Sequence, residues 1–194
     1  MSLQLRTMMK NYKRYSDEEL ISITATEPEP EKSGAFSELY NRHSNKLYLY
    51  CRKIFGDGTY AEDIFQDTFM QLIRSIESKI VIGNVQGYLL RTARNLSLNF
   101  KRNNNKLLVE FDDYHAYFTE RNFEVKELTQ MIDAALDLLP EEHKEAFILQ
   151  AYQGLTYSEI AALTEVPLTT VRNRVVRAKS KLREILSPML EEGK

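Results

Sequence analysis

Positively charged side chains gather near the C-terminal end of the chain, in a pattern that suits phosphate binding. Between Leu168 and Arg183 the sequence has six Lys or Arg residues and no Asp or Glu. Four apolar residues in this stretch recur at steps of four, three and four, so at ~100° per residue they share one narrow helix face. They are Val171, Val175, Ala178 and Leu182. The pattern predicts a helix that is apolar on one side and basic on the other.

The basic side of this predicted helix carries groups that can form hydrogen bonds with base edges. The residues opposite the apolar face are Thr169, Asn173, Val176, Arg177 and Ser180. The cations that flank them, suited to phosphates, are Arg172, Arg174, Lys179 and Lys181. An ordinary amphipathic helix with a solvated basic face is the alternative, but such a helix usually mixes charges of both signs. We therefore favour contact with nucleic acid.

A shorter helix is predicted immediately before the basic one. Ser158 can cap it, ahead of the apolar residues in 160–163, and residues 164–166 form a tight turn. Pro167 stands where the second helix can begin, because a first-turn residue needs no amide donor. One of the two threonines that follow Leu168 offers an alternative cap there. Two helices with this spacing predict a helix-turn-helix whose second helix enters the DNA major groove.

A second basic segment lies between Arg91 and Lys106, with five Lys or Arg residues, no Asp or Glu, and interleaved asparagines. It belongs to a helix predicted over 88–102, which follows a loop over 77–87 that contains two glycines. This helix is a second candidate surface for nucleic acid.

An earlier helix, predicted over 60–76, has a polar side without an obvious structural purpose. Its predicted buried residues are Ala61, Phe65, Phe69, Leu72 and Ile76. The residues on its other side are Asp63, Gln66, Asp67, Met70 and Arg74. From the pattern alone, this side is equally a docking face or a plain solvated one.

The whole chain is expected to be all-α, with two small helical domains joined by a flexible acidic linker. The expected domains span 16–103 and 126–186, with the linker at 104–125. A loose segment is expected over 1–15 and a tail over 187–194. The first domain opens with helices over 16–24 and 35–55, separated by a loop rich in proline and glutamate.

Composition narrows the classes of function. The chain has 194 residues and a net charge of −2, so nucleic acid would be bound through patches. The single cysteine, Cys51, excludes an internal disulfide and fits a reducing, cytoplasmic location. No apolar run approaches the ~20 residues of a membrane span. Catalysis is not expected, since the histidines are scattered, the adjacent acids at 62–63 and 112–113 lack a partner, and no phosphate-binding glycine loop is present. We expect no metal, cofactor or small-molecule substrate.

Four segments together resemble the extracytoplasmic-function sigma factors of bacterial RNA polymerase. In chain order they are AFSELYNRH, AEDIFQDTFMQLI, GYLLRTARNLSLNFKR and LPEEHKEAFILQAYQGLTYSEIAALTEVPLTTVRNRVVRAKSKLR. The match covers roughly 16–103 and 126–186, in the order and spacing of the family. Its partners would be the core enzyme of RNA polymerase, promoter DNA and an anti-sigma factor.

The resemblance implies a role for each surface. The residues that would dock on the polymerase core are Asp63, Gln66, Asp67 and Met70. The loop over 77–87 would capture a flipped base of the minus-ten element. The residues that would bind and melt minus-ten DNA are Asn84, Arg91, Arg94, Asn95, Asn99 and Arg102. The residues that would read minus-thirty-five duplex DNA are Thr169, Thr170, Arg172, Asn173, Arg174, Arg177 and Lys181.

The chain departs from the family pattern at two positions. Many relatives have glycine in the turn where this chain has Glu165, and a non-glycine residue at positive φ is strained. Tyr88 stands where relatives often carry tryptophan. The alternative function is a stand-alone helix-turn-helix regulator, which would explain the last helices but neither the segment over 91–106 nor the Asp63 side of its helix.

Overall fold

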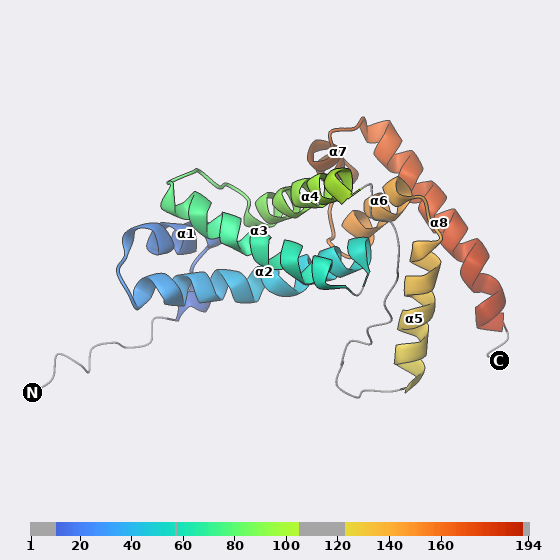
Figure 1. The fold of residues 1–194 in the computed structure, drawn as a ribbon, viewed down its shortest axis with the longest axis horizontal. Coiled ribbons are helices and arrows are strands. Elements are labelled where there is room, and N and C mark those ends of the chain that lie inside the picture. The colour runs from blue at the N-terminus through green and yellow to red at the C-terminus, as the bar shows by residue number, and fades with distance from the viewer. Residues whose placement is uncertain (1–10, 57, 105–122, 192–194) are drawn as a thin grey trace, which may run out of the picture.

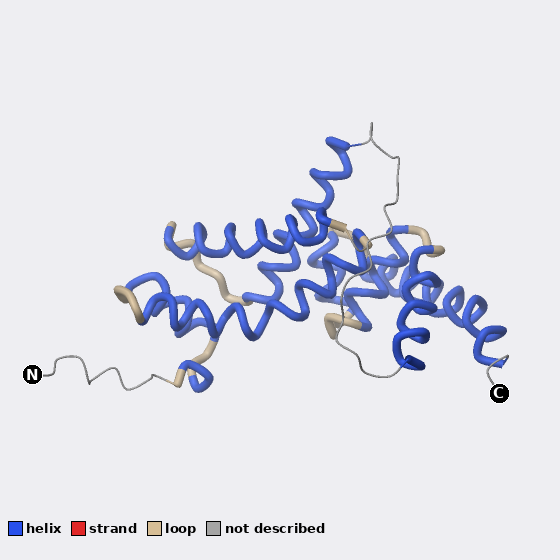
Figure 2. The backbone as a smooth tube through the Cα atoms, turned by 60° about the horizontal axis from the view of Figure 1, so that its bottom comes forward, coloured by secondary structure: helices blue, strands red, loops and turns tan. Residues whose placement is uncertain are grey.

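The computed structural model describes residues 11–56, 58–104 and 123–191, and in that part all regular structure is helical (Figures 1 and 2). The elements are η1 (Tyr12–Arg14), α1 (Asp17–Thr26), α2 (Glu31–Phe55), α3 (Thr59–Glu77), α4 (Val85–Asn104), α5 (Phe123–Asp137), α6 (Glu141–Ala151), α7 (Tyr157–Thr164) and α8 (Leu168–Glu191). We call η1 to α4 the N-terminal half and α5 to α8 the C-terminal half. The predicted all-α fold is confirmed.

Local signals explain where the helices of the N-terminal half begin and end. Ser16 and Glu19 form a reciprocal capping box at the start of α1. Gly56 ends α2 with a φ of 76°, a conformation that glycine adopts without steric cost. Two starts differ from the prediction: α2 begins at Glu31 instead of residue 35, and α4 begins at Val85 instead of residue 88. The first turn of α2 has no apolar residue in 31–34, whereas α4 begins with Val85, which is buried like Leu89 one turn later.

The helices of the N-terminal half pack around one apolar core. Fully buried leucines come from α1, α2, α3 and α4; they are Leu20, Leu39, Leu47, Leu72, Leu89 and Leu90. On α3 the buried face is centred one position away from the prediction, because Ile64 and Thr68 are buried whereas Phe65 is half-buried. Phe65 instead lies at the edge of the core, with its ring 5.3 Å from that of Phe69 and 5.6 Å from that of Tyr48.

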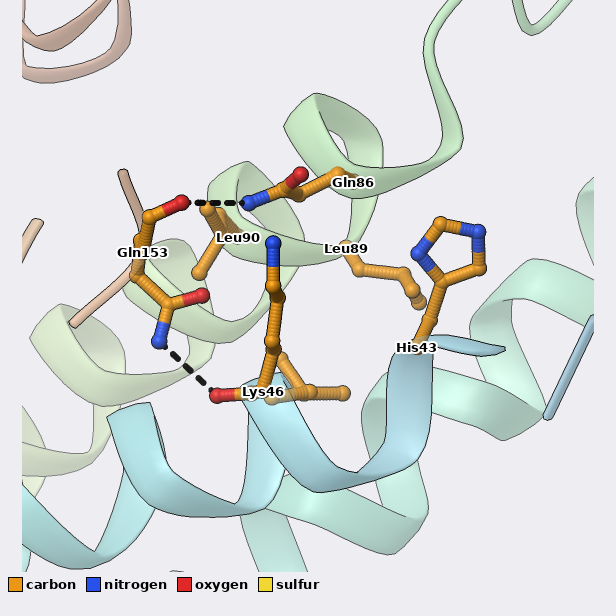
Figure 3. Close-up of a pocket in the computed structure, with 7 residues that line it drawn as sticks. His43, Lys46, Gln86, Leu89, Leu90 and Gln153 are labelled. Carbon is orange, nitrogen blue, oxygen red and sulfur yellow. Dashed lines mark hydrogen bonds between the residues drawn. The ribbon is translucent and has the colours of Figure 1, made fainter. Parts of the chain in front are cut away.

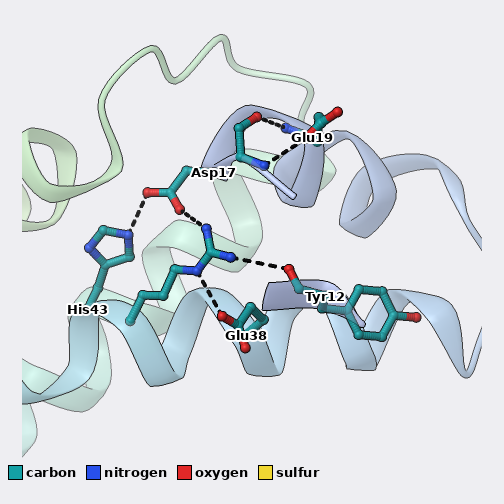
Figure 4. A network of polar contacts seen from close by, with 7 residues as sticks. Tyr12, Asp17, Glu19, Glu38 and His43 are labelled. Carbon is teal, nitrogen blue, oxygen red and sulfur yellow. Dashed lines mark hydrogen bonds and ion pairs between the residues drawn. The ribbon is translucent and has the colours of Figure 1, made fainter. Parts of the chain in front are cut away.

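A polar network ties the segment before α1 to α2 (Figure 4). The Arg42 guanidinium donates to Glu38 Oε1 at 2.8 Å, to Asp17 Oδ1 at 3.0 Å and to the Tyr12 carbonyl at 3.2 Å. His43 Nε2 lies 2.7 Å from Asp17 Oδ2. Tyr12 is therefore held in place, which differs from the expectation of a loose segment up to residue 15; residues 1–10 lie outside the described part.

The C-terminal half is built around the buried side of α8, which contacts α5, α6 and α7. A capping box of Thr156 and Glu159 starts α7, so the predicted cap, Ser158, is wrong and is an exposed residue inside the helix. The carboxylate of Glu159 accepts from the Thr156 backbone, which lowers its pKa. At the other end, α8 continues to Glu191, past the predicted limit at residue 186.

The two halves pack against each other. Helix α6 contacts α2, and α7 contacts α4 (Figure 1). The apolar core of the N-terminal half continues into Ala146, Ile148 and Leu149 of α6. The predicted linker at 104–125 falls mostly on residues 105–122, outside the described part. No helix of the described residues is long and apolar enough to cross a membrane.

Candidate nucleic-acid interface

Helix α8 exposes the polar face that the sequence predicts for it. Its four predicted apolar residues, Val171 to Leu182, are at most 6% exposed. The residues that the structure exposes on the other side are Thr169, Arg172, Asn173, Val176, Arg177, Lys179, Ser180, Lys181 and Arg183. Cations, hydroxyls and an amide therefore share one continuous surface, which suits both phosphates and base edges.

Two residues predicted on this surface are only half-exposed. The side chain of Arg174 is 18% exposed and forms an ion pair with Glu142 of α6. It therefore joins α8 to α6 within the C-terminal half. Thr170 lies in the first turn, where its amide donates to the Pro167 carbonyl at 2.9 Å. Lys181 is exposed, and its ammonium lies 2.9 Å from Glu184 Oε1.

The turn before α8 contains a residue in the left-handed region. Glu165 follows the last residue of α7 with φ 59° and ψ 34°. This conformation reverses the chain direction within three residues, so that α8 starts at Leu168. Glycine adopts this conformation without steric cost, whereas the glutamate here adopts it at a cost.

Helix α4 presents a second polar surface. Arg91, Asn95 and Asn99 are exposed and recur every four residues, so they lie on one side of the helix. Arg102 belongs to the last turn of α4, but its side chain lies outside the described part. An arginine and two asparagines combine phosphate binding with amide hydrogen bonding, which suits single-stranded nucleic acid.

Two further residues predicted for this surface have other contacts. The Arg94 side chain, 18% exposed, donates from Nε to Glu145 Oε1 of α6 at 3.0 Å. Asn84 Oδ1 accepts from the amide of Gly87 at 2.9 Å, which caps the start of α4. A Cβ atom on Gly87 would lie 3.3 Å from the Asn84 side chain, so glycine leaves room for this cap. Sequence reasoning did not foresee either contact.

A groove lies between α1 and the loop that joins α3 to α4. Its volume is about 300 Å³, and it is lined by Glu18, Ile21, Ser22 and Ala25 of α1, by Ile76 of α3 and by residues 79–83. Val81 is 95% exposed at this loop, and Ile80 is 53% exposed. The sequence predicts the loop but not its groove. Three consecutive apolar residues at 80–82, in a stretch with glycines, are the signal that could have indicated it.

The predicted docking side of α3 is exposed. Asp63, Gln66, Asp67 and Met70 all face solvent, and Met70 is 47% exposed. A methionine among carboxylates and an amide gives this side both apolar and polar contacts to offer. None of these four residues belongs to the surfaces of α4 and α8 described above.

Potential metal ligands and the single cysteine are the remaining candidates for chemistry among the described residues. Among the described residues no group of His, Cys, Asp or Glu could hold a metal ion. Cys51 is buried in the core, and burial raises the pKa of its thiol to about 12, which keeps it unreactive at neutral pH. His43 is occupied in the α1–α2 network.

Comparison with known proteins identifies both halves. Residues 39–107 match the family model described as Sigma-70 region 2, and residues 129–182 match Sigma-70, region 4. SigE, an extracytoplasmic-function RNA polymerase sigma factor of Mycolicibacterium smegmatis, is 32% identical over 160 residues. This match covers 79% of the chain and 62% of SigE, so the chain spans less than two thirds of that relative.

A second relative and two solved structures agree with these matches. The ferric citrate uptake sigma factor FecI of Escherichia coli is 30% identical, over 74% of this chain and 86% of FecI. CnrH, solved with the cytosolic domain of CnrY, has a TM-score of 0.64 at 22% identity and covers 89% of this chain and 97% of that one. The sigma factor RpoE of Bartonella quintana, solved with the anti-sigma factor NepR, also has a TM-score of 0.64, at 23% identity, with coverages of 78% and 96%. These two structures share the fold of the chain. Both halves and their order thus match, and the chain belongs to the extracytoplasmic-function sigma factors of the sigma-70 family.

Proposed function

We propose that this chain binds the core enzyme of RNA polymerase and directs it to promoters, by reading minus-thirty-five duplex DNA and by capturing melted minus-ten DNA. The observation that carries the proposal is a pair of exposed polar surfaces in two separately matched halves, with Arg91, Asn95 and Asn99 on α4 and a basic surface on α8. A promoter offers two elements at a set spacing, and each half provides one surface for one element.

Duplex reading is assigned to α8. Its N-terminal turns expose Thr169, Arg172 and Asn173, followed by Arg177 one turn later. Residues at the start of a recognition helix reach base edges in the major groove, while cations along its sides hold phosphates. Arg174 is paired with Glu142, so we assign it to the support of α8, with a phosphate contact only when that ion pair opens.

Capture of single-stranded DNA is assigned to α4 and to the groove beside α1. Arg91 would hold a phosphate, and Asn95 and Asn99 would bond unpaired base edges. The groove volume of about 300 Å³ exceeds the size of one base, and its lining is mostly apolar, as stacking requires. Asn84 ends the loop that lines this groove, and its side chain caps the start of α4.

Docking on the polymerase core is assigned to the exposed side of α3. Asp63, Gln66 and Asp67 stand on consecutive turns and Met70 extends the surface. Because none of them belongs to either basic surface, the chain can contact polymerase and DNA at the same time. We place the domains at 16–103 and 126–186, joined by the acidic linker at 104–125.

An anti-sigma factor is the further partner that we propose. The Bartonella RpoE was solved with the anti-sigma factor NepR, and CnrH was solved with the cytosolic domain of CnrY. The apolar residues that remain exposed, among them Leu138 at 67% and Leu168 at 46%, are suited to a protein contact. We also propose a cytoplasmic location, because RNA polymerase and promoter DNA are found there. The stand-alone regulator is not favoured, because such a regulator would have no use for the sigma-70 region 2 that residues 39–107 match.

The test is transcription from a defined site. Purified chain and core polymerase should initiate at promoters that share two elements, which sequencing of transcript ends from a genomic template would map. Labelled promoter duplex at ~150 mM salt should bind weakly to the chain alone and tightly after core enzyme is added. Nanomolar, sequence-specific binding without polymerase would contradict the proposal and support the regulator.

A further inference from the structure

The described structure places one carboxylate of the C-terminal half against two residues of the N-terminal half. Glu145 Oε1 of α6 accepts from Arg94 Nε of α4 at 3.0 Å and from the Tyr50 hydroxyl of α2 at 3.1 Å. The side chains of Arg94 and Glu145 are only 18% and 20% exposed. Burial, and next the charge of Glu145, raise the pKa of Tyr50 well above its usual value, so this hydroxyl stays a donor.

Other polar contacts continue along the same seam. Lys53 of α2 pairs with Asp133 of α5 and lies over the ring of Tyr152. Gln153 joins the halves twice (Figure 3). Its side-chain Nε2 donates to the backbone carbonyl of Lys46 at 2.8 Å, and its backbone carbonyl accepts from Gln86 Nε2 at 3.0 Å. The seam therefore links α2 and α4 to three segments of the C-terminal half.

The seam combines apolar packing with polar contacts. Apolar residues of α6, α7 and α8 pack on the core of the N-terminal half, which favours the closed arrangement in the free chain. The specific contacts, however, are ion pairs and side-chain amides, which water and phosphate can replace at little cost once the halves separate. Beside Gln153 a small cavity of about 10 Å³, lined by both apolar and polar side chains, interrupts the packing.

We propose that Glu145 is an intramolecular stand-in for a DNA phosphate, and that it keeps the free chain closed with Arg94 occupied. This inference rests on the proposed function of α4 in single-strand binding. A carboxylate competes directly with a phosphate for a guanidinium, since both are bidentate oxyanion acceptors. The Asp63 side of α3 stays exposed in the closed arrangement, so docking on polymerase can precede opening.

The first test measures binding of a labelled single-stranded oligodeoxynucleotide of mixed sequence to the free chain. Glu145→Gln keeps an acceptor for Tyr50 and removes the charge that holds Arg94. If one fifth of free chains are open, full opening should improve the affinity about fivefold. The freed arginine should also steepen the slope of log affinity against log salt by about 0.7, the value for one phosphate on a single strand.

Two further variants make this result specific. Glu27→Gln removes the same charge at an exposed position after α1. Its affinity for the oligonucleotide should change only by the small amount that one less negative charge causes anywhere on the surface. Arg94→Ala combined with Glu145→Gln should lose the gain, because the cation that Glu145 occupies is then absent. A gain of equal size in the Glu27 variant, or one that persists without Arg94, would overturn the proposal.

The second test measures the distance between the halves without polymerase or DNA, so it does not depend on the proposed function. Spin labels on Ser37→Cys in α2 and Ser187→Cys in α8 use two exposed serines, while the native Cys51 is buried and stays unlabelled. The free chain should show one dominant distance, and Glu145→Gln should broaden and lengthen the distribution. An unchanged distribution would refute the role of Glu145 in holding the chain closed, even if the chain proves to be a working sigma factor.

Discussion

Replacing Glu165 by glycine should stabilise the chain, because Glu165 is the residue that reverses the chain between α7 and α8 in a left-handed conformation. Its φ of 59° and ψ of 34° lie in the region where a Cβ atom approaches the following carbonyl oxygen. Its carboxylate also lies at the C-terminal end of α7, where the partial charge of the helix is negative. The backbone strain and the charge at the helix end therefore both make Glu165 less stable than glycine at this position.

The size of the effect follows from three contributions. Relief of the left-handed conformation contributes about 1–2 kcal/mol. The greater backbone freedom of glycine in the unfolded chain removes about 0.5–1 kcal/mol of this gain. Loss of the carboxylate at the helix end adds about 0.3 kcal/mol at an exposed position. The net stabilisation is about 1 kcal/mol, which raises the melting temperature of a 150–250-residue protein by about 2–4 °C.

Thermal and urea unfolding of three variants would separate these contributions. Glu165→Gln removes the charge and keeps the strain, so it should recover only the last few tenths of a kcal/mol. Lys79→Gly is a matched measurement elsewhere, because Lys79 has a φ of 57° after α3. Its amide donates to the Ile76 carbonyl and the next amide donates to the Ser75 carbonyl, which is the hydrogen-bonding pattern of a Schellman cap. If Glu165→Gly lowered the melting temperature, or gained no more than Glu165→Gln, the strain argument would be wrong.

Three predictions concern the binding surfaces. Arg177→Ala should cost ~1–3 kcal/mol in duplex binding by the polymerase complex and relax discrimination at one base pair, whereas Lys179→Ala should weaken all sequences alike; uniform loss in both would make α8 a phosphate clamp. Asp63→Ala with Gln66→Ala should weaken binding to core polymerase in a pull-down without a change in melting temperature, and unaltered binding would exclude this side of α3. Val176, which is 55% exposed beside Arg177, should contact a thymine methyl group in the promoter. Replacing that thymine by uracil should then weaken DNA binding by the native chain but not by the Val176→Ala variant.

The elements and faces of the fold were largely predictable because their signals are local. The capping box of Ser16 and Glu19 and the end of α2 at Gly56 depend on residues within one or two turns. The buried face of α8 follows from apolar spacing alone. The start at Glu31 has no apolar signal, because residues 31–34 are charged or small. The start at Val85 lies between Gly83 and Gly87, and these glycines indicate a loop although Val85 is buried like Leu89. The cap of α7 was assigned two residues late, since Thr156 and Ser158 offer the same chemistry and only the position of Glu159 distinguishes them.

The candidate binding surfaces were predictable in part for the same reason. Exposure of Asp63, Asn95 and Arg177 follows from their place opposite an apolar stripe. Their roles as contacts to polymerase and DNA remain predictions, since exposure alone does not name a partner. The groove between α1 and the loop at 79–83 was not predictable, because it depends on how two segments more than 50 residues apart approach each other.

By itself the sequence determined an all-helical chain, the apolar face of each main helix and two basic surfaces, because helix period, caps and charge are properties of neighbouring residues. Only the tertiary structure decided which of the cations are occupied. Arg94 meets Glu145 across 51 positions of sequence, and Arg174 meets Glu142 across 32. Such pairs depend on the packing of α6 against α4 and α8, and a charge pattern along the chain contains no information about that distance.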